Sequence, residues 1–366
     1  LAGPYSAAFV APTAAISDLI EVRAGHTVTV TATVSTDDVL INGTLVVNAG
    51  FTFSILNGTA ATDMTIASSG SVTNNGTMSS VSGSVIQMDG TINNNLNLNF
   101  NTTGASVQIN GTINNLATGT TTGTAAVLSF NSGSLYDHQR NAGALPIATW
   151  DANSTVQITG TTTATPTNIS GYSFGHFIHN ASSQTAAVSY AITSTATRFK
   201  GNYTLESTGT GSLSFKNGTG AATLNVDGNF YVNTGILNAN IGATAGLTLN
   251  IAGDYIQSNG TFNLSTAAIA CIINFDGNYT QTGGTHTQSS TTLSTINFRG
   301  AGKTFNQSGG TYTNTYFNYV LTSTPYLADL TLGSAFTLST SRTFLVNPNT
   351  TLTLGANMVN NGAITQ

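Results

Sequence analysis

The sequence contains very little charge. Only 6% of its 366 residues are Asp, Glu, Lys or Arg, whereas a typical soluble domain has about 25%. The 8 Lys and Arg residues are scattered singly, which excludes nucleic-acid binding, because phosphate recognition needs clustered cations. Glutamate occurs only at Glu21 and Glu206, so converging carboxylates of the kind that cleave glycosidic bonds are scarce.

Cysteine and long apolar runs are also scarce. Cys271 is the single cysteine, so an internal disulfide is excluded and we expect a small buried core residue. No apolar run approaches the ~20 residues that span a bilayer, so we expect no membrane span. The opening residues, 1–5, lack a basic stretch before an apolar one. We therefore expect a processed end or an internal fragment there, and export must be inferred from composition.

The residues that are abundant favour β-structure. Hydrophobic residues make up 40% of the chain, with 17 Phe and 12 Tyr, and the polar remainder is mostly Thr, Asn, Ser and Gly. Such residues suit a half-buried, pleated surface, and they exclude the disorder that accompanies few aromatics and high net charge. No segment has a convincing 3.6-residue period, so we expect no helices.

Internal repeats are clearest between residues 200 and 315. Each repeat has the form apolar–Asn–apolar–x–Gly–x–aromatic, followed by a polar stretch and Gly–Thr–apolar. One set of glycines recurs at intervals of 27, 25, 24 and 23 residues, and a second set recurs in phase with it. The first set consists of Gly201, Gly228, Gly253, Gly277 and Gly300, and the second of Gly235, Gly260, Gly284 and Gly310.

This period predicts an all-β chain folded as a parallel β-helix, or β-solenoid, of about 15 coils with 23–27 residues each. Three short strands and three bends use about that many residues. We expect regular N-terminal coils over 1–132, irregular coils with a protruding loop over 133–200, and regular coils over 201–366, in one continuous solenoid. Antiparallel hairpins with Asn-Gly turns remain the alternative.

Two segments resemble secreted surface proteins of Bacteroidetes-type bacteria. The first, residues 11–30, has Pro-Thr, then Asp-x-apolar-x-apolar, then Ala-Gly-His-Thr-Val; the second is residues 147–160, followed by the Gly-Asn-Phe/Tyr coils. The resemblance covers most of the chain and implies a secreted right-handed β-helix, often with a C-terminal sorting domain. No such domain is recognisable here, and the resemblance transfers no catalytic residue.

Some repeat positions hold residues that could bind a ligand, but each also has a structural interpretation. Asp227, Asp254 and Asp276 sit at or beside one bend in successive coils, where they predict turn capping rather than a calcium ladder. We expect the bend aromatics Phe230, Tyr255 and Tyr279 to stack in the core, with an outward aromatic stripe as the alternative.

The positions of the histidines favour residues of the solenoid wall rather than metal ligands. His176 and His179 should face opposite sides of a strand. A metal site combining them with Asp137 and His138 is disfavoured. His286 occupies a slot that holds Phe262 and Tyr312 in neighbouring coils.

We therefore expect a non-catalytic, extracellular bacterial structural protein: a stalk, an adhesin or a self-assembling fibre subunit. It should need no cofactor and no metal, and should form homo-oligomers or fibres by end-to-end or strand-addition contacts. The alternative is a β-helix that binds or cleaves carbohydrate through the 135–155 loop, and a glycan is then the ligand. The candidate binding residues there are Tyr136, Asp137, His138, Arg140, Trp150 and Asp151.

Overall fold

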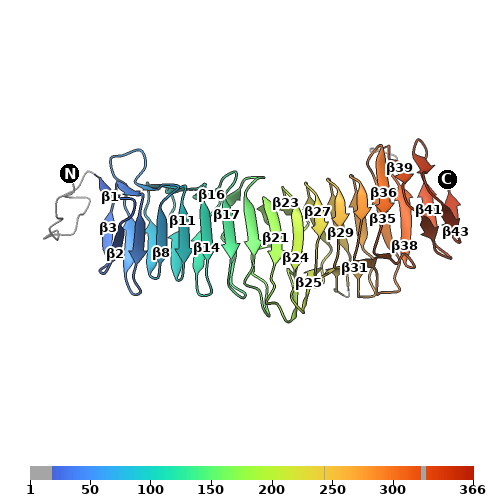
Figure 1. Cartoon of the computed structure of the whole chain (residues 1–366), viewed down its shortest axis with the longest axis horizontal. Helices are drawn as coiled ribbons and strands as arrows, with labels where there is room; N and C mark the ends of the chain where they lie inside the picture. Colours follow the sequence, from blue (N-terminus) through green and yellow to red (C-terminus); the bar gives the residue numbers. More distant parts are fainter. Residues whose placement is uncertain (1–18, 243, 323–326) are drawn as a thin grey trace. The chain divides into compact units, whose positions relative to one another are not determined.

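The computed structural model describes residues 19–242, 244–322 and 327–366. Throughout these ranges the regular structure consists of β-strands (Figure 1). The strand pairings are parallel and in register, which excludes the hairpin alternative. The predicted parallel β-solenoid of about 15 turns is confirmed, since one sheet contains 15 strands with one strand per turn. Residues 11–18 of the surface-protein motif lie outside the described residues.

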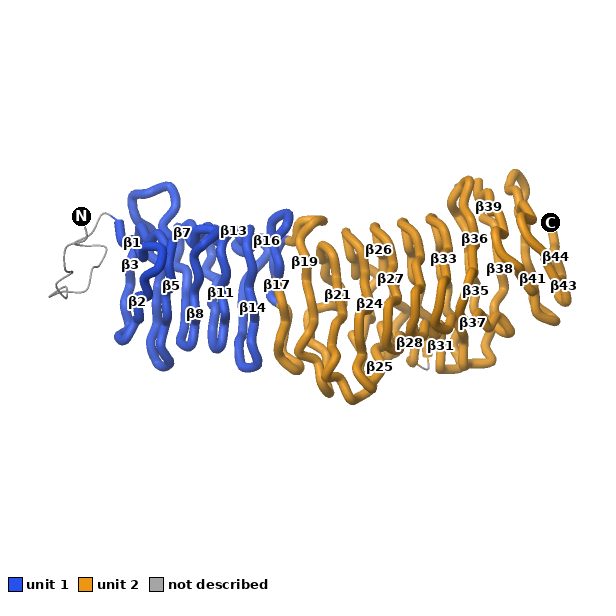
Figure 2. The backbone as a smooth tube through the Cα atoms, viewed as in Figure 1, with its two compact units in different colours: residues 1–135, 146–149 blue, residues 136–145, 150–366 orange. Residues whose placement is uncertain are grey.

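The chain divides into two compact units, which Figure 2 colours separately. Unit 1 comprises residues 1–135 and 146–149, and unit 2 comprises residues 136–145 and 150–366. Strands β17 (Leu135–His138) and β18 (Thr149–Trp150) each contain residues of both. The predicted three-part division at residues 132 and 200 stays a prediction.

Unit 1 contributes strands to three parallel sheets, and each coil places one strand in each sheet. The first sheet contains β1 (Ile20–Val22), β4 (Val39–Ile41), β7 (Met64–Ile66), β10 (Val85–Met88), β13 (Ser106–Ile109) and β16 (Leu128–Phe130). The second contains β2 (Thr27–Val30), β5 (Thr44–Val47), β8 (Ser71–Asn74), β11 (Thr91–Asn94) and β14 (Thr112–Asn115). The third contains β3 (Val34–Thr36), β6 (Thr52–Ile55), β9 (Thr77–Ser80), β12 (Asn97–Phe100) and β15 (Thr120–Gly123).

Unit 2 follows the same plan. Its first sheet contains β19 (Thr155–Ile158), β21 (His176–Asn180), β24 (Tyr203–Ser207), β27 (Phe230–Val232), β30 (Tyr255–Gln257), β33 (Tyr279–Gln281), β36 (Lys303–Gln307), β39 (Asp329–Leu332) and β42 (Thr351–Leu354). The second contains β20 (Ser173–Phe174), β23 (Thr197–Phe199), β26 (Ala222–Val226), β29 (Leu247–Ile251), β32 (Ile272–Phe275), β35 (Ser294–Phe298), β38 (Phe317–Leu321), β41 (Thr343–Val346) and β44 (Ala363–Thr365). The third contains β22 (Ala187–Ser189), β25 (Ser212–Lys216), β28 (Ile236–Asn240), β31 (Thr261–Ser265), β34 (Thr285–Thr287) and β37 (Thr311–Tyr312), and β40 (Phe336–Leu338) pairs with β43 (Met358–Asn360).

Coil length differs between the units. In unit 2 Phe230 pairs with Tyr255 and Tyr255 with Tyr279, which reproduces the predicted period. In unit 1 the amides of Asn74 and Asn94 bond to each other although they are only 20 residues apart. Other coils of unit 1 are longer, since Thr44 pairs with Ser71, 27 residues further on, and this variation explains why its repeats are less evident at a 23–27 residue period.

A column of aromatic side chains fills the core of unit 2. Tyr255 stacks on Phe230 and Tyr279 with ring centroids 5.8 Å and 4.8 Å apart, and all three side chains are buried. The prediction that these bend aromatics point inward is therefore confirmed, and the outward stripe is excluded. Stacked and edge-on pairs of this kind contribute about 0.5–1.5 kcal/mol each beyond the area they bury.

A buried glutamine fixes the bend after several of these aromatics. Gln257 Nε2 donates to the carbonyl oxygens of Gly260 (3.2 Å) and Thr285 (3.0 Å), while its Oε1 accepts from the hydroxyl of Tyr255 (2.9 Å). Gly260 has φ +70°, a conformation that favours glycine. Because the Gly260 carbonyl already accepts from the backbone N–H of Thr285 (2.8 Å), the glutamine adds a second link between this bend and the next coil.

Buried asparagines form hydrogen bonds between coils inside unit 1. Asn94 Nδ2 donates to Asn115 Oδ1 (2.9 Å) and to the carbonyl oxygen of Thr120 (3.0 Å), and its Oδ1 accepts from Asn74 Nδ2 (2.8 Å). All three asparagines are fully buried. We call Asn74, Asn94 and Asn115 the inner asparagine ladder.

Replacing the middle member tests the importance of this ladder. Asn94→Leu removes three buried hydrogen bonds, each worth about 1 kcal/mol, so we expect unit 1 to lose roughly 3 kcal/mol. Hydrogen-exchange mass spectrometry of unit 1 peptides measures the loss. Asn95→Leu is the control, since half-buried Asn95 makes one such bond, to Asn75 Oδ1. Equal protection in both variants would contradict the assignment.

Candidate functional site

The predicted binding segment does not leave the wall of the solenoid as a loop at residue 135. Residues 135–138 form strand β17, and Trp150 ends β18. Because side chains alternate along a strand, Tyr136 and His138 point into the core, where Trp150 is buried as well. The rings of Tyr136 and Trp150 meet edge-on with centroids 6.2 Å apart. The expectation of a loop beginning here was therefore wrong, and three of the six candidate side chains pack inside.

The other three candidates lie nearer the surface. Asp137 accepts hydrogen bonds from Gln139 Nε2 and Thr159 Oγ1, both at 2.7 Å. Asp151 caps a turn by accepting from the backbone N–H of Asn153 (2.8 Å). Arg140 is half-buried, and its charge helps to lower the pKa of His138. The six residues do not share one face, and the glycan-binding role proposed for them stays a prediction.

Buried histidines line the interior of unit 2. Desolvation lowers the pKa of His138 and His179 to about 4 and that of His286 to about 3. His179 bonds through Nδ1 to the Tyr190 hydroxyl (2.7 Å) and through Nε2 to Gln184 Oε1 (2.8 Å). These imidazoles are neutral near pH 7, so they act as polar core residues rather than as proton-exchanging groups.

The expected orientations of His176 and His179 and the repeat position of His286 are confirmed. His179 is buried while His176, three residues earlier on β21, faces outward, where its Nδ1 accepts from the backbone N–H of Asn202 (2.9 Å). His286 pairs in register with Phe262 and Tyr312 and is fully buried. Among the described residues, no group of three His, Cys, Asp or Glu side chains could hold a metal ion.

Cys271 is a core residue as expected. Its thiol is fully buried and donates to the carbonyl oxygen of Leu264 (3.1 Å). Burial raises the pKa of the thiol to about 11. Since the thiolate is the reactive form of cysteine, this residue is unsuited to nucleophilic chemistry.

The repeated aspartates have two different roles. Asp254 Oδ1 accepts from the backbone N–H of Asn278 (2.7 Å), just as Asn229 Oδ1 accepts from the N–H of Asp254 (2.8 Å). These bonds join the bends of successive coils rather than closing a turn locally, so the expected local turn capping is not what holds Asp254. Asp227 and Asp276, by contrast, are paired with arginines that the sequence analysis did not single out.

These ion pairs flank a polar surface pocket on the second sheet of unit 2. Arg198 Nε donates to Asp227 Oδ2 (2.6 Å), and Arg299 forms a two-point contact with Asp276 (2.6 and 2.9 Å). Ala252 lies at the corresponding position of the intervening coil. We call this pocket the Arg–Asp notch. It is lined by Arg198, Asn225, Val226, Asp227, Asn250, Ala252, Asp276 and Arg299.

A row of amides crosses the floor of the notch. Asn250 Nδ2 donates to Asn225 Oδ1 (2.7 Å), and Asn274 Nδ2 donates to Asn250 Oδ1 (2.6 Å). Asn297 continues the row with a bond of 2.7 Å to Asn274. We call these four residues the outer asparagine ladder. The sequence signal was the Asn of the apolar–Asn–apolar repeat, whose outward position follows from strand alternation.

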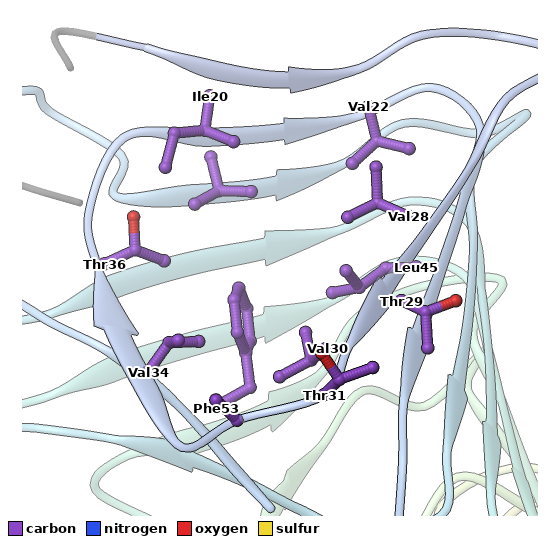
Figure 3. Close-up of a pocket in the computed structure, with 12 residues that line it drawn as sticks. Ile20, Val22, Val28, Thr29, Val30, Thr31, Val34, Thr36, Leu45 and Phe53 are labelled. Carbon is purple, nitrogen blue, oxygen red and sulfur yellow. The ribbon is translucent and has the colours of Figure 1, made fainter. Parts of the chain in front are cut away.

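A second pocket lies at the first described coil of unit 1. It is lined almost wholly by apolar side chains, among them Ile20, Val22, Val30 and Phe53, which point toward one another in Figure 3. Val28, also in its lining, is 45% exposed. The pocket borders the hydrophobic interior, and its lining contains no ionisable side chain.

In comparisons with known proteins, no protein-family model, curated protein or solved structure matches the chain. The resemblance to bacterial surface proteins therefore stays a resemblance. Within the described residues, no helix is long and apolar enough to cross a membrane.

The buried histidines predict that acid destabilises unit 2. A base whose pKa is lowered by folding takes up its proton more readily in the unfolded state. The contribution of the buried neutral imidazoles to the free energy of unfolding is fully present above pH 6.5. It is lost as the pH decreases toward the pKa of the folded state, which is about 3 for His286. In His286→Phe the Tyr279 hydroxyl keeps its bond to Gln281, so we expect the stability of the variant relative to the wild type to rise by about 2 kcal/mol between pH 7.5 and pH 5.

Urea titrations followed by fluorescence of Trp150, the single tryptophan, measure this difference at pH 5 and pH 7.5. The control is His26→Phe, which changes an exposed histidine of unit 1. An unchanged pH dependence in His286→Phe would rule out the explanation.

Proposed function

We propose that the protein is a non-catalytic extracellular structural protein of bacteria, a cell-surface stalk or adhesin built as a β-solenoid. The observation that carries the proposal is the use of polar side chains. Inside and outside, they bond mainly from one coil to the next, as the inner and outer asparagine ladders do. Such side chains serve the integrity of the stack.

The ionisable groups support the same proposal. His138, His179, His286 and Cys271 are buried, with pKa values moved by desolvation away from the range useful near pH 7. General acid–base and thiolate catalysis need groups that exchange protons near the working pH.

The outer faces of unit 1 carry few charged groups and many hydrogen-bonding ones. Hydroxyl groups meet across neighbouring coils, as Thr44 meets Ser71 (3.1 Å) and Ser54 meets Ser79 (3.0 Å). Thr122 Oγ1 continues the pattern by donating to Asn99 Oδ1 (3.2 Å). A surface of this kind suits a structure that presents hydrogen-bonding groups to its surroundings. The proposed export rests on this composition and on the resemblance to secreted surface proteins.

A second candidate function is assembly into fibres, for which the last described coil would supply the contact if no further coil follows it. Among the described strands β44 pairs with β41, and Leu354, Val359 and Ile364 are 56%, 53% and 45% exposed. All strands in a sheet point the same way, so a first coil of another copy could add in parallel to this edge. Such a head-to-tail contact propagates into a filament when it does not close.

The structural proposal predicts no turnover of polysaccharides. Purified protein is incubated with neutral and uronate-containing polysaccharides, and new reducing ends and unsaturated sugars are measured. We expect none above the buffer blank. In the source bacterium, antibodies should label intact cells as strongly as permeabilised ones. Turnover by the purified protein, or labelling only after permeabilisation, would overturn the proposal.

The fibre proposal predicts concentration-dependent growth. Sedimentation velocity and negative-stain microscopy should show head-to-tail chains that lengthen with protein concentration. Ile364→Lys should abolish them by placing a charge on the apolar edge. Leu96→Lys is the matched control, because Leu96 is 44% exposed on a bend of unit 1. Monomers at every concentration, or equal loss in both variants, would refute self-assembly.

A further inference from the structure

The Arg–Asp notch is distinguished by a gap in a row of charged side chains. Asp227, Ala252 and Asp276 each follow the last residue of their strand in three successive coils. Coils are spaced about 4.8 Å apart, so the exposed methyl group of Ala252 leaves an opening between two carboxylates about 10 Å apart. The opening is wide enough to admit one ring-sized group.

The notch carries no net charge, because its two aspartates offset its two arginines. Its wall combines carboxylates that accept hydrogen bonds, guanidinium groups that donate them and amides that do both. With no net charge, the notch gives neither a polyanion nor a polycation a net Coulomb attraction. A neutral ligand rich in hydroxyl groups matches this wall, since each hydroxyl both donates and accepts.

The polar groups are also held in place before any ligand arrives. Arg299 grips Asp276 at two points, which restricts both side chains. The outer asparagine ladder fixes Asn225 and Asn250 through bonds between coils. The side chains of Arg198 and Asp227 remain 54% and 30% exposed, so they are accessible to a ligand. Such preorganisation reduces the entropy lost on binding.

We infer that the Arg–Asp notch binds a neutral glycan, with one pyranose ring over Ala252 and its hydroxyls bonded to Asp227, Asn250 and Asp276. The inference rests on the proposed function, because it supplies the ligand class of an adhesin. A glycan chain running along the stack meets the amides of the outer asparagine ladder at regular intervals. The proposed binding residues therefore lie on the second sheet of unit 2 and are not those of the 135–155 segment.

The test uses the full chain and a set of defined probes. Cellohexaose, xylohexaose, mannohexaose and laminarihexaose are the neutral probes, and dextran sulfate and polygalacturonate are the anionic ones. Calorimetry and glycan-array binding should show binding of at least one neutral probe and none of the anionic ones. Binding restricted to the anionic probes, or binding of none of the six, would overturn the inference.

Two variants, each with an alanine replaced by tryptophan, locate the site. Ala252→Trp fills the notch without removing a polar group, and we expect it to weaken binding of the neutral probe at least tenfold. Ala187→Trp places the same side chain at an exposed position of β22 on another sheet and should bind as the wild type does. Circular dichroism checks that both variants fold. Wild-type affinity in Ala252→Trp would refute the site.

The outcome is separable from the proposed structural function. Loss of glycan binding in Ala252→Trp leaves surface display and the absence of polysaccharide turnover unchanged if both proposals hold. If the protein binds none of the glycan probes but antibodies still label it on intact cells, the proposed structural function stands and only the proposed ligand is refuted.

Discussion

The stacking of parallel strands in register governs the rest of this structure. Because each residue lies over its equivalent in the coils above and below, every position along a coil becomes a column about 4.8 Å in period. A side chain is therefore selected for its contact with a copy of the same position. Aromatic rings stack, as Tyr255 does on Tyr279, and amides bond to amides, as Asn250 does to Asn225.

The same constraint accounts for the scarcity of charge. A row of like charges spaced by one coil would repel at every step. Asp254 lies between Asn229 and Asn278, which avoid that repulsion while keeping the same acceptor geometry. Asp227 and Asp276 are each neutralised by an arginine. Neutral Thr, Asn and Ser side chains can occupy long columns without that penalty.

The fold could be predicted from the sequence wherever the columns repeat visibly. The recurring glycines Gly228, Gly253 and Gly277 marked the bends. Glycine is needed there because a Cβ at Gly253 would come within 2.6 Å of the Gly228 carbonyl. The inward aromatics and the slot of His286 followed from the same alignment. The 135–138 segment was misinterpreted because its polar composition suggested a loop, whereas Tyr136 and His138 are polar residues buried by strand alternation.

The Arg–Asp notch could not be predicted in the same way. Arg198 and Asp227 are 29 residues apart, and their contact depends on the exact length of the coil between them. The position of Ala252 becomes meaningful only once the neighbouring coils are placed beside it. Sequence periodicity identifies the columns. The gaps in a column, where a ligand can enter, can be identified only from the pairing of the strands.

The amides of the outer asparagine ladder all have the same orientation. In each bond from Asn250 to Asn297 the Nδ2 group points to the preceding coil and the Oδ1 group to the following one. Their dipoles therefore add along the column, as peptide dipoles add along a helix. This face of unit 2 consequently has an electrical direction, with partial positive charge toward β26 and partial negative charge toward β35, so its two ends are chemically distinct.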